Sequence, residues 1–237
     1  MEKIQFLVDG QKISGTYFEP SPSRQKFPGV IFFHGMTSSQ KNYLPLAQKL
    51  TEQGIAGLSI DLRGHGASEG DFAKLTIADG VRDGLTAYDF LANQKGIDTE
   101  RIGLCGSSFG GTIASLIARK RKVASLVLRA PAAYPNDMVS YTQIMEKEEI
   151  FFQTMKKMEE TTAIQAMSTF TGRLLVVISE KDTVIPERMC EAYLSQAVAA
   201  KQKEASVIKE SSHSLDDPAW REEFNRLSVQ WFKKTLY

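Results

Sequence analysis

The most informative stretch of the sequence reads Ile102-Gly103-Leu104-Cys105-Gly106-Ser107-Ser108-Phe109-Gly110-Gly111. Here an apolar run that predicts a strand enters a run that predicts a helix through a Gly-x-Ser-x-Gly motif, which is the order of a nucleophile elbow. The elbow is a tight turn, so the positions two before and two after the serine must lack a side chain that would collide with the neighbouring backbone. Ser108, held above the sheet at this turn, is therefore the predicted nucleophile.

Two neighbours of Ser108 are rival nucleophiles. A Gly-x-x-x-Gly frame centred on Cys105 would need glycine at position 107, where the chain has serine. A frame centred on Ser107 would need glycine at positions 105 and 109, where the chain has Cys105 and Phe109. Only Ser108 is flanked by glycines at the required spacing, and Cys105 is expected to be a small apolar strand residue.

The chain also offers a base and an acid for this serine. A serine hydroxyl needs a base to remove its proton, and histidine usually supplies it. His34 and His65 precede the motif, whereas His213 lies in a polar loop after the last predicted strand. The chain order Ser, Asp, His, used by one large class of serine hydrolases, selects His213. Asp182, just past a predicted strand, is the candidate that orients the imidazole, and Glu180, closer to the strand end, is the alternative.

Two backbone N–H groups are candidates for binding the oxyanion that forms when a serine attacks a carbonyl group. One is the N–H of Phe109, the residue after the nucleophile. The other is the N–H of Met36 in the turn Phe33-His34-Gly35-Met36, which follows the third predicted strand. We expect His34 to be a structural hydrogen-bonding residue of that turn and not a proton carrier.

Alternation of short β-rich runs with helical patterns predicts an α/β fold. The Asp9-Gly10 pair between the first two runs predicts an antiparallel hairpin at the N-terminus. From residues 29–33 onward the strand-like runs are nearly all apolar, as expected for parallel strands covered by helices on both faces. The prediction is a mostly parallel, eight-stranded sheet with strands near 4–8, 12–18, 28–33, 55–60, 101–105, 123–129, 173–179 and 204–208.

Helical patterns fill the intervals between these strands. The last predicted helix has the best-defined start, because Asp217 is an N-cap residue and Pro218 suits the first helical position. Helices are expected near 41–53, 78–94, 109–120, 187–200 and 217–234.

The interval between the strands at 123–129 and 173–179 is far longer than one crossover helix needs. We interpret residues 131–170 as a helical cap inserted into a single domain that spans 1–237. The cap holds five of the eight methionines, and such flexible apolar side chains suit an adaptable binding surface. Packing of the cap onto the body explains them at least as well. The candidate substrate-binding residues in the cap are Met138, Phe151 and Phe152.

Composition narrows the classes of function. The 29 Lys and Arg residues nearly balance the 28 Asp and Glu residues, which argues against nucleic acid as a partner. No window has the length of apolar sequence that a membrane span needs, and the first residues form no signal peptide, so we expect a cytoplasmic protein. Cys105 and Cys190 are expected to be reduced thiols. No metal-ligand spacing is present, so neither a metal nor an organic cofactor is expected, and the oligomeric state stays open.

Several motifs together resemble the α/β-hydrolase superfamily, and the resemblance covers nearly the whole chain. Within it the sequence is most similar to serine esterases of the cinnamoyl/feruloyl esterase and monoacylglycerol lipase type, which are grouped with serine aminopeptidase-like hydrolases. The motifs are His34-Gly35-Met36, Asp61-Leu62-Arg63-Gly64-His65-Gly66-Ala67-Ser68, Gly106-Ser107-Ser108-Phe109-Gly110-Gly111, Ser179-Glu180-Lys181-Asp182 and His213.

The resemblance implies a serine hydrolase that cleaves small-molecule carboxylic esters. The length and the apolar side of the expected cap suggest acyl chains of small to medium size. The elbow of that branch usually reads Gly-His-Ser-Gln-Gly-Gly, whereas Ser107 and Phe109 flank the nucleophile here. The same acyl-enzyme chemistry serves thioesters and amides, so an acyl-thioesterase or a small peptidase is the alternative. A ligand-binding α/β-hydrolase without turnover is a third possibility.

Overall fold

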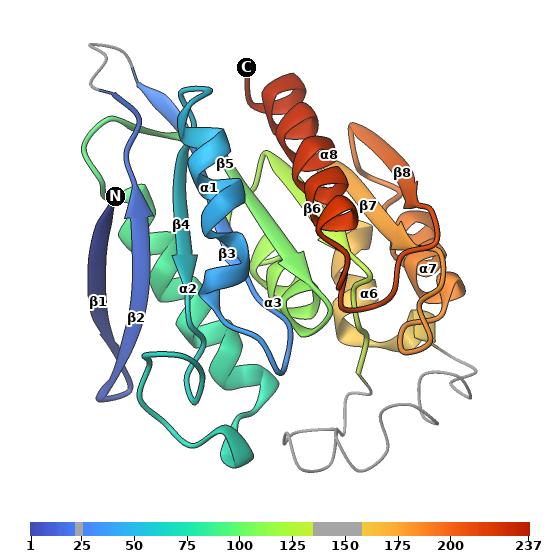
Figure 1. The fold of residues 1–237 in the computed structure, drawn as a ribbon, viewed down its shortest axis with the longest axis horizontal. Helices are drawn as coiled ribbons and strands as arrows, with labels where there is room; N and C mark the ends of the chain where they lie inside the picture. The colour runs from blue at the N-terminus through green and yellow to red at the C-terminus, as the bar shows by residue number, and fades with distance from the viewer. Residues whose placement is uncertain (22–25, 135–157) are drawn as a thin grey trace.

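The computed structural model describes residues 1–21, 26–134 and 158–237. Its eight strands form one sheet in the spatial order β1-β2-β4-β3-β5-β6-β7-β8 (Figure 1). The strands are β1 (Glu2–Val8), β2 (Gln11–Phe18), β3 (Phe27–Phe33), β4 (Ala56–Ile60), β5 (Ile97–Ser107), β6 (Ser125–Arg129), β7 (Arg173–Ser179) and β8 (Gln202–Ile208). The α-helices are α1 (Leu44–Thr51), α2 (Ile77–Ala92), α3 (Phe109–Ala118), α6 (Thr162–Gln165), α7 (Glu187–Gln196) and α8 (Pro218–Leu236).

The predicted hairpin and the predicted parallel sheet are both confirmed. β1 and β2 pair antiparallel in a register that sets Val8 opposite Gln11. Asp9 and Gly10, the two residues of the turn, both have positive φ, as a tight hairpin turn of matching twist requires. β2 pairs antiparallel with β4, and every pairing from β3 to β8 is parallel.

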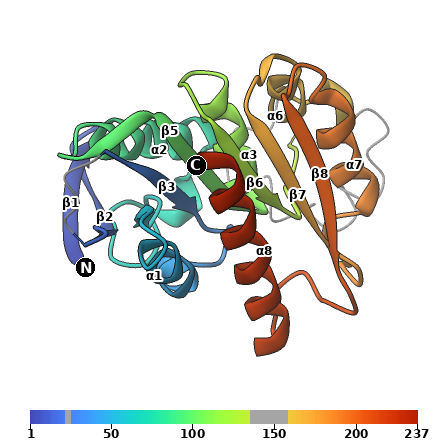
Figure 2. The same ribbon diagram turned by 90° about the horizontal axis from the view of Figure 1, so that it is seen from above.

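Two layers of helices cover the sheet, as the apolar strands predict (Figure 2). α2, α3, α6 and α7 pack on one face over a core that includes Ile31, Leu104 and Val176. α1 and α8 pack on the other face over a second core that includes Phe32 and Val127. Neighbouring residues of one strand thus enter different cores, because successive side chains point to opposite faces of a sheet.

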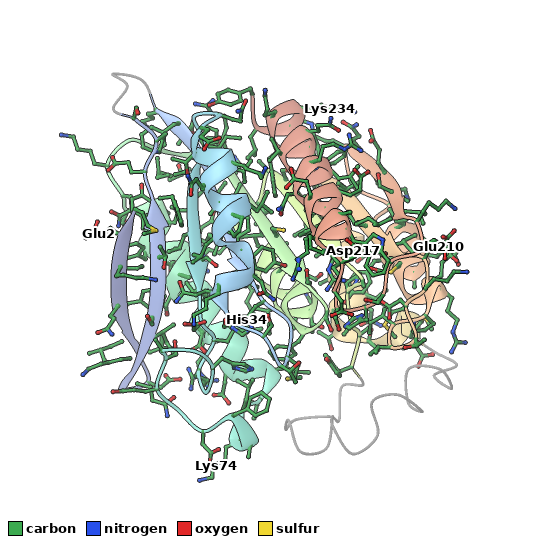
Figure 3. The ribbon with its side chains drawn as sticks, viewed as in Figure 1. Glu2, His34, Lys74, Glu210, Asp217 and Lys234 are labelled. Carbon is green, nitrogen blue, oxygen red and sulfur yellow. The ribbon has the colours of Figure 1, made fainter. Side chains whose placement is uncertain are left out.

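The start of α8 agrees with the prediction from Asp217-Pro218. The Asp217 carboxylate accepts a hydrogen bond of 2.8 Å from the N–H of Ala219, and Pro218 is the first helical residue. Lys234 lies in the last turn, at the opposite end of the helix (Figure 3). A cation there interacts favourably with the helix dipole.

Some elements differ from the predictions. β8 is an edge strand whose residues are mostly exposed, so the prediction of nearly all-apolar strands is wrong for this one. β5 begins at Ile97, before the predicted strand, because Phe27 of β3 pairs with Ile97 beyond a register shift. The helical pattern near 41–53 divides into a 3-10 turn, η1 (Gln40–Tyr43), and α1. A further 3-10 turn, η2 (Phe72–Lys74), was not expected.

The predicted cap is only partly covered by the described residues. Met138, Phe151 and Phe152 lie outside them, so the cap and these binding residues stay predictions. The described part contains η3 (Met158–Glu160), α6 and η4 (Ala166–Thr169). These short turns belong to the core beside α3 and α7, where Met167 and Phe170 are buried. At these two positions the apolar side chains pack onto the body.

None of the helices in the described ranges has the length and apolar character needed to cross a membrane.

Candidate active site

Ser108 lies at the turn between β5 and α3. Its backbone has a φ of 52° and a ψ of −120°, a conformation that L-residues rarely adopt and that strained functional turns use. Its N–H donates a 3.0 Å hydrogen bond to the carbonyl of Arg129, and its carbonyl accepts from the N–H of Gly111 at 2.8 Å. These bonds fix the turn at the carboxyl end of the parallel strands.

The two glycines of the motif are needed because backbone passes close to both. A Cβ at Gly106 would lie 2.2 Å from the carbonyl oxygen of Gly110. A Cβ at Gly110 would lie 2.0 Å from the carbonyl oxygen of Phe33, at the end of the neighbouring strand. The close backbone atoms alone explain why both positions are occupied by glycine.

We expect Gly110→Ala to lower the free energy of unfolding by about 3 kcal/mol, because backbone atoms must move to admit the methyl group. Gly35→Ala is the matched comparison. A Cβ at Gly35 would meet only the Cβ of Ser108 at 3.6 Å and the carbonyl oxygen of Ser107 at 3.7 Å, which are ordinary contacts. Its cost should stay below about 1 kcal/mol. Urea denaturation measures both values, and equal destabilisation by the two substitutions would contradict the steric explanation.

His213 and Asp182 lie in the loops that follow β8 and β7. The His213 Nδ1 atom is 2.7 Å from the Asp182 Oδ2 atom. The other carboxylate oxygen accepts hydrogen bonds from the N–H groups of Val184, at 2.9 Å, and Ile185, at 2.8 Å. Asp182 is therefore held by three donors, one of which is the imidazole of His213.

Glu180 occupies a different environment from Asp182. Its carboxylate accepts from the Lys209 ammonium at 2.6 Å and from the N–H of Glu210 at 2.9 Å. The hydrogen bond from Lys209 lowers the pKa of Glu180. The structure thus brings His213 together with Asp182, and not with the alternative acid.

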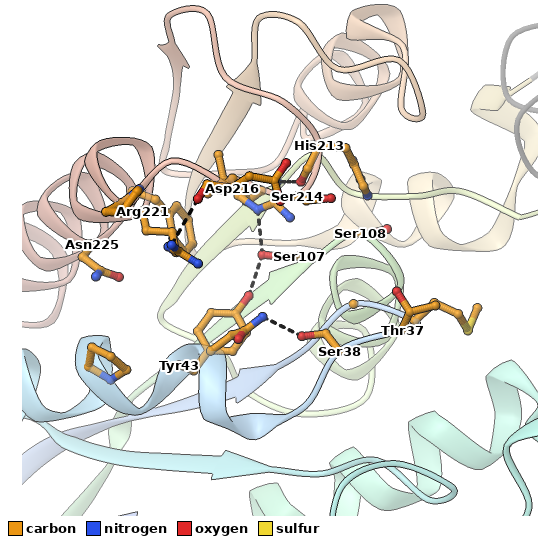
Figure 4. A pocket seen from close by; sticks show the side chains of 18 of the residues that line it. Thr37, Ser38, Tyr43, Ser107, Ser108, His213, Ser214, Asp216, Arg221 and Asn225 are labelled. Carbon is orange, nitrogen blue, oxygen red and sulfur yellow. Dashed lines mark hydrogen bonds between the residues drawn. The ribbon is translucent and has the colours of Figure 1, made fainter.

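A cavity of about 720 Å³ opens beside the elbow. Ser108 and His213 both line it (Figure 4). Met36, in the loop after β3, lines it as well. Residues of α8, among them Arg221 and Asn225, also line this cavity. The cavity is large enough for a small to medium ligand, and it gives that ligand access to the Ser108 hydroxyl.

The peptide between Gly35 and Met36 has a fixed orientation. The Gly35 carbonyl accepts from the His34 Nδ1 atom at 2.8 Å and from the N–H of Ser38 at 3.1 Å. Because the C=O and N–H groups of a trans peptide point in opposite directions, the N–H of Met36 points away from these donors. Among the described residues, neither the N–H of Met36 nor that of Phe109 has an acceptor.

Within the described ranges, His34 forms hydrogen bonds only with backbone groups, as expected for a structural histidine. Its Nε2 atom accepts from the N–H of Leu62 at 3.0 Å, so the proton must be on Nδ1, which donates to the Gly35 carbonyl. Burial lowers the pKa of His34 to about 4, because the charged imidazolium is disfavoured away from water.

The lowered pKa of His34 predicts a loss of stability in mild acid. Between pH 4 and 6.5 the unfolded chain binds a proton at this residue that the folded chain does not, so stability falls as the pH falls. We expect His34 to contribute a loss of about 2 kcal/mol near pH 5 relative to neutral pH. His34→Gln should remove this contribution. Urea denaturation of both proteins at the two pH values measures the difference, and parallel pH profiles would contradict the prediction.

Tyr43 and Arg129, which are not among the predicted site residues, contact the elbow. The Ser107 hydroxyl is 2.6 Å from the Tyr43 hydroxyl, a contact drawn dashed in Figure 4, and it accepts from the Arg129 Nε atom at 3.0 Å. The Arg129 Nη1 atom donates to the backbone carbonyl of His213 at 2.7 Å. Arg129 therefore joins the elbow to the histidine loop.

Cys105 is fully buried within β5. Burial raises the pKa of its thiol, which disfavours the reactive thiolate, and the side chain belongs to the core beneath α1 and α8. In the described ranges no group of His, Cys, Asp and Glu side chains is arranged to hold a metal ion.

Several known proteins are similar to this chain in sequence or in fold. The uncharacterized protein Rv2307c of Mycobacterium tuberculosis is 26% identical over 210 residues, which are 87% of this chain and 69% of the relative. Thiohydrolase aneE of Aspergillus aculeatus is 31% identical over 144 residues, which are 58% of this chain and 44% of the relative. The structure of Est1E from Butyrivibrio proteoclasticus with bound ferulic acid superposes with a TM-score of 0.79 at 19% identity, covering 98% of this chain and 99% of Est1E.

One family model matches residues 25–162, more than half of the chain, and this family is described as serine aminopeptidase, S33. The matched residues include the turn at Met36 and the elbow at Ser108. The predicted α/β-hydrolase resemblance is confirmed by this match and by the fold. The chain belongs to the serine aminopeptidase S33 family of α/β-hydrolases.

Proposed function

We propose that this hydrolase cleaves carboxylic esters of small to medium acyl chains through an acyl-enzyme on Ser108, His213 and Asp182. The observation that carries the proposal is the 2.7 Å contact between His213 and Asp182 at a cavity that Ser108 also lines. A histidine oriented by a carboxylate beside a serine in an elbow is the arrangement that activates a weak hydroxyl nucleophile.

The first half of the reaction forms the acyl-enzyme. The Asp182 carboxylate accepts a hydrogen bond from the Nδ1–H of His213, which keeps the proton on Nδ1 and leaves the lone pair of Nε2 free to take the Ser108 proton. The Ser108 Oγ atom then attacks the ester carbonyl carbon, and the N–H groups of Met36 and Phe109 stabilise the oxyanion. The imidazolium returns the proton to the alcohol oxygen as the ester bond breaks.

The second half releases the acid. Water enters the cavity, His213 takes one of its protons, and the resulting hydroxide attacks the acyl carbon on Ser108. The same two N–H groups stabilise the second oxyanion. Collapse of this intermediate frees the carboxylic acid and returns the proton to Ser108.

A thioester substrate is the second candidate. The relative from Aspergillus aculeatus is named a thiohydrolase, and it is 31% identical over the matched 144 residues. Thioesters react through the same acyl-enzyme, so the residues proposed above serve both substrate classes. The leaving group then distinguishes the candidates: an alcohol for the ester and a thiol for the thioester.

Initial rates on 4-nitrophenyl acetate, butyrate, octanoate and palmitate test the proposal, with matched butyryl thioester and butyryl anilide substrates in parallel. We expect the ester rates to depend on Ser108 and to be highest for a short or medium chain. Faster Ser108-dependent cleavage of the thioester would favour the second candidate. Absence of Ser108-dependent turnover on every substrate would contradict both.

A further inference from the structure

Arg129 is a buried cation at the carboxyl end of β6. Only 8% of the residue is exposed. Its guanidinium donates to the Ser107 hydroxyl and to the His213 carbonyl, and Nη1 lies 3.5 Å from the Ser179 hydroxyl. All these partners are neutral, and among the described residues no carboxylate forms an ion pair with Arg129.

No anion in the described part of the chain therefore contacts the charge of Arg129. Moving a cation out of water costs several kcal/mol, so buried arginines are normally paired. Burial accordingly lowers the pKa of Arg129, opposed in part by the attraction of Asp182. The Asp182 carboxylate, however, is already bonded to His213 and to two backbone N–H groups.

The carboxylates that line the cavity also have other partners. Glu222 accepts from the Lys49 ammonium at 2.9 Å, and Asp216 accepts from the Ser212 hydroxyl at 3.0 Å. Arg221, on the same wall, is exposed and donates to the Asp216 carbonyl at 3.1 Å. Among the described residues, neither of these two carboxylates forms an ion pair with Arg129.

The remaining nitrogen of Arg129 is available to a ligand. Nη2 has no acceptor among the described residues. This nitrogen is not fully buried, so a ligand in the cavity can reach it. Arg129 lines the same cavity as Ser108 and His213. The link from Ser107 to the His213 carbonyl needs two N–H donors but no net charge. A neutral amide side chain also supplies two N–H donors.

We propose that Arg129 binds an anionic group, a carboxylate, on the substrate of this site. The proposal rests on the proposed function, because it names the class of ester that Ser108 attacks. The carboxylate would accept from Nη2 in the cavity and supply the charge that the protein leaves out. It could belong to the acyl chain or to the alcohol, and the two sources are tested separately.

Two matched pairs of esters test the proposal. For the acyl side, the mono-4-nitrophenyl ester of adipic acid is compared with the 4-nitrophenyl ester of adipamic acid. For the alcohol side, 3-carboxyphenyl butyrate is compared with 3-carbamoylphenyl butyrate. Each pair differs only in carboxylate against carboxamide, and each kcat/KM is divided by the rate of hydroxide-catalysed hydrolysis. We expect a preference of about tenfold or more for the carboxylate in one pair.

Variants at Arg129 assign the preference to this residue. Arg129→Gln keeps N–H donors and loses the charge, so the carboxylate preference should fall to about onefold, whereas Arg129→Lys should keep part of it. The ratio of two substrates on one protein cancels any loss of folded or active enzyme. A wild-type protein without preference in either pair would overturn the proposal, and so would a preference that Arg129→Gln leaves unchanged.

Failure of the proposed function is recognised separately. If none of the esters is cleaved in a Ser108-dependent manner, titration calorimetry of the wild-type protein with hexanoate and with hexanamide tests the anion site alone. About tenfold tighter binding of hexanoate, lost in Arg129→Gln, would support the site. Equal binding of the two ligands, or no binding of either, would overturn it.

Discussion

Ser108→Ala is expected to lower ester turnover by about 10⁶-fold, because nucleophile, base and acid act as a unit. The alanine side chain fits the turn, since the hydroxyl forms none of the backbone bonds that hold the elbow. Stability should therefore change little while the acyl-enzyme can no longer form. Single-turnover rates with 4-nitrophenyl butyrate measure the loss, and thermal unfolding checks the fold.

Ser115→Ala is the matched control for this variant. Ser115 is a buried serine of α3, the helix that follows the elbow, and its hydroxyl donates to the Gly111 carbonyl at 2.8 Å. It does not line the cavity. We expect its turnover to stay within about threefold of wild type. A Ser108→Ala protein that keeps a tenth of the wild-type rate would rule out Ser108 as the nucleophile.

Local signals account for the parts of the fold that the sequence predicts well. The hairpin at Asp9-Gly10 and the helix start at Asp217-Pro218 depend on neighbouring residues, so they can be read directly from the chain. The elbow at Ser108 is equally local, because its glycines stand two residues away. The buried strands are also predicted well, because each one is a continuous apolar run of neighbouring residues.

Contacts between distant residues account for what the sequence does not predict. Arg129 ends an apolar strand, and nothing near it in the chain indicates that its guanidinium reaches the carbonyl of His213, 84 residues later. Tyr43 meets Ser107 across 64 residues. β8 becomes an exposed edge only because no further strand follows it in the sheet. Such features depend on the packing of whole elements.

Asp182→Asn is expected to lower turnover by about 10⁴-fold. The asparagine carbonyl can still accept from the N–H groups of Val184 and Ile185, so the loop keeps its shape. Its amide nitrogen would then face His213 Nδ1 and donate to it. That bond favours the tautomer with the proton on Nε2, which cannot accept the Ser108 proton.

Glu180→Gln separates the two candidate acids. Glu180 lies two residues from Asp182 in the same loop, and the sequence favours Asp182 without excluding Glu180. Its carboxylate bonds to Lys209 at the surface, and a surface ion pair contributes little to stability, so we expect a change in turnover below about threefold. The pair of variants is measured as kcat/KM on 4-nitrophenyl butyrate. If Glu180→Gln were the damaging change and Asp182→Asn the mild one, the histidine would take its orientation from the other carboxylate, and the loop after β7 would have to rearrange during catalysis.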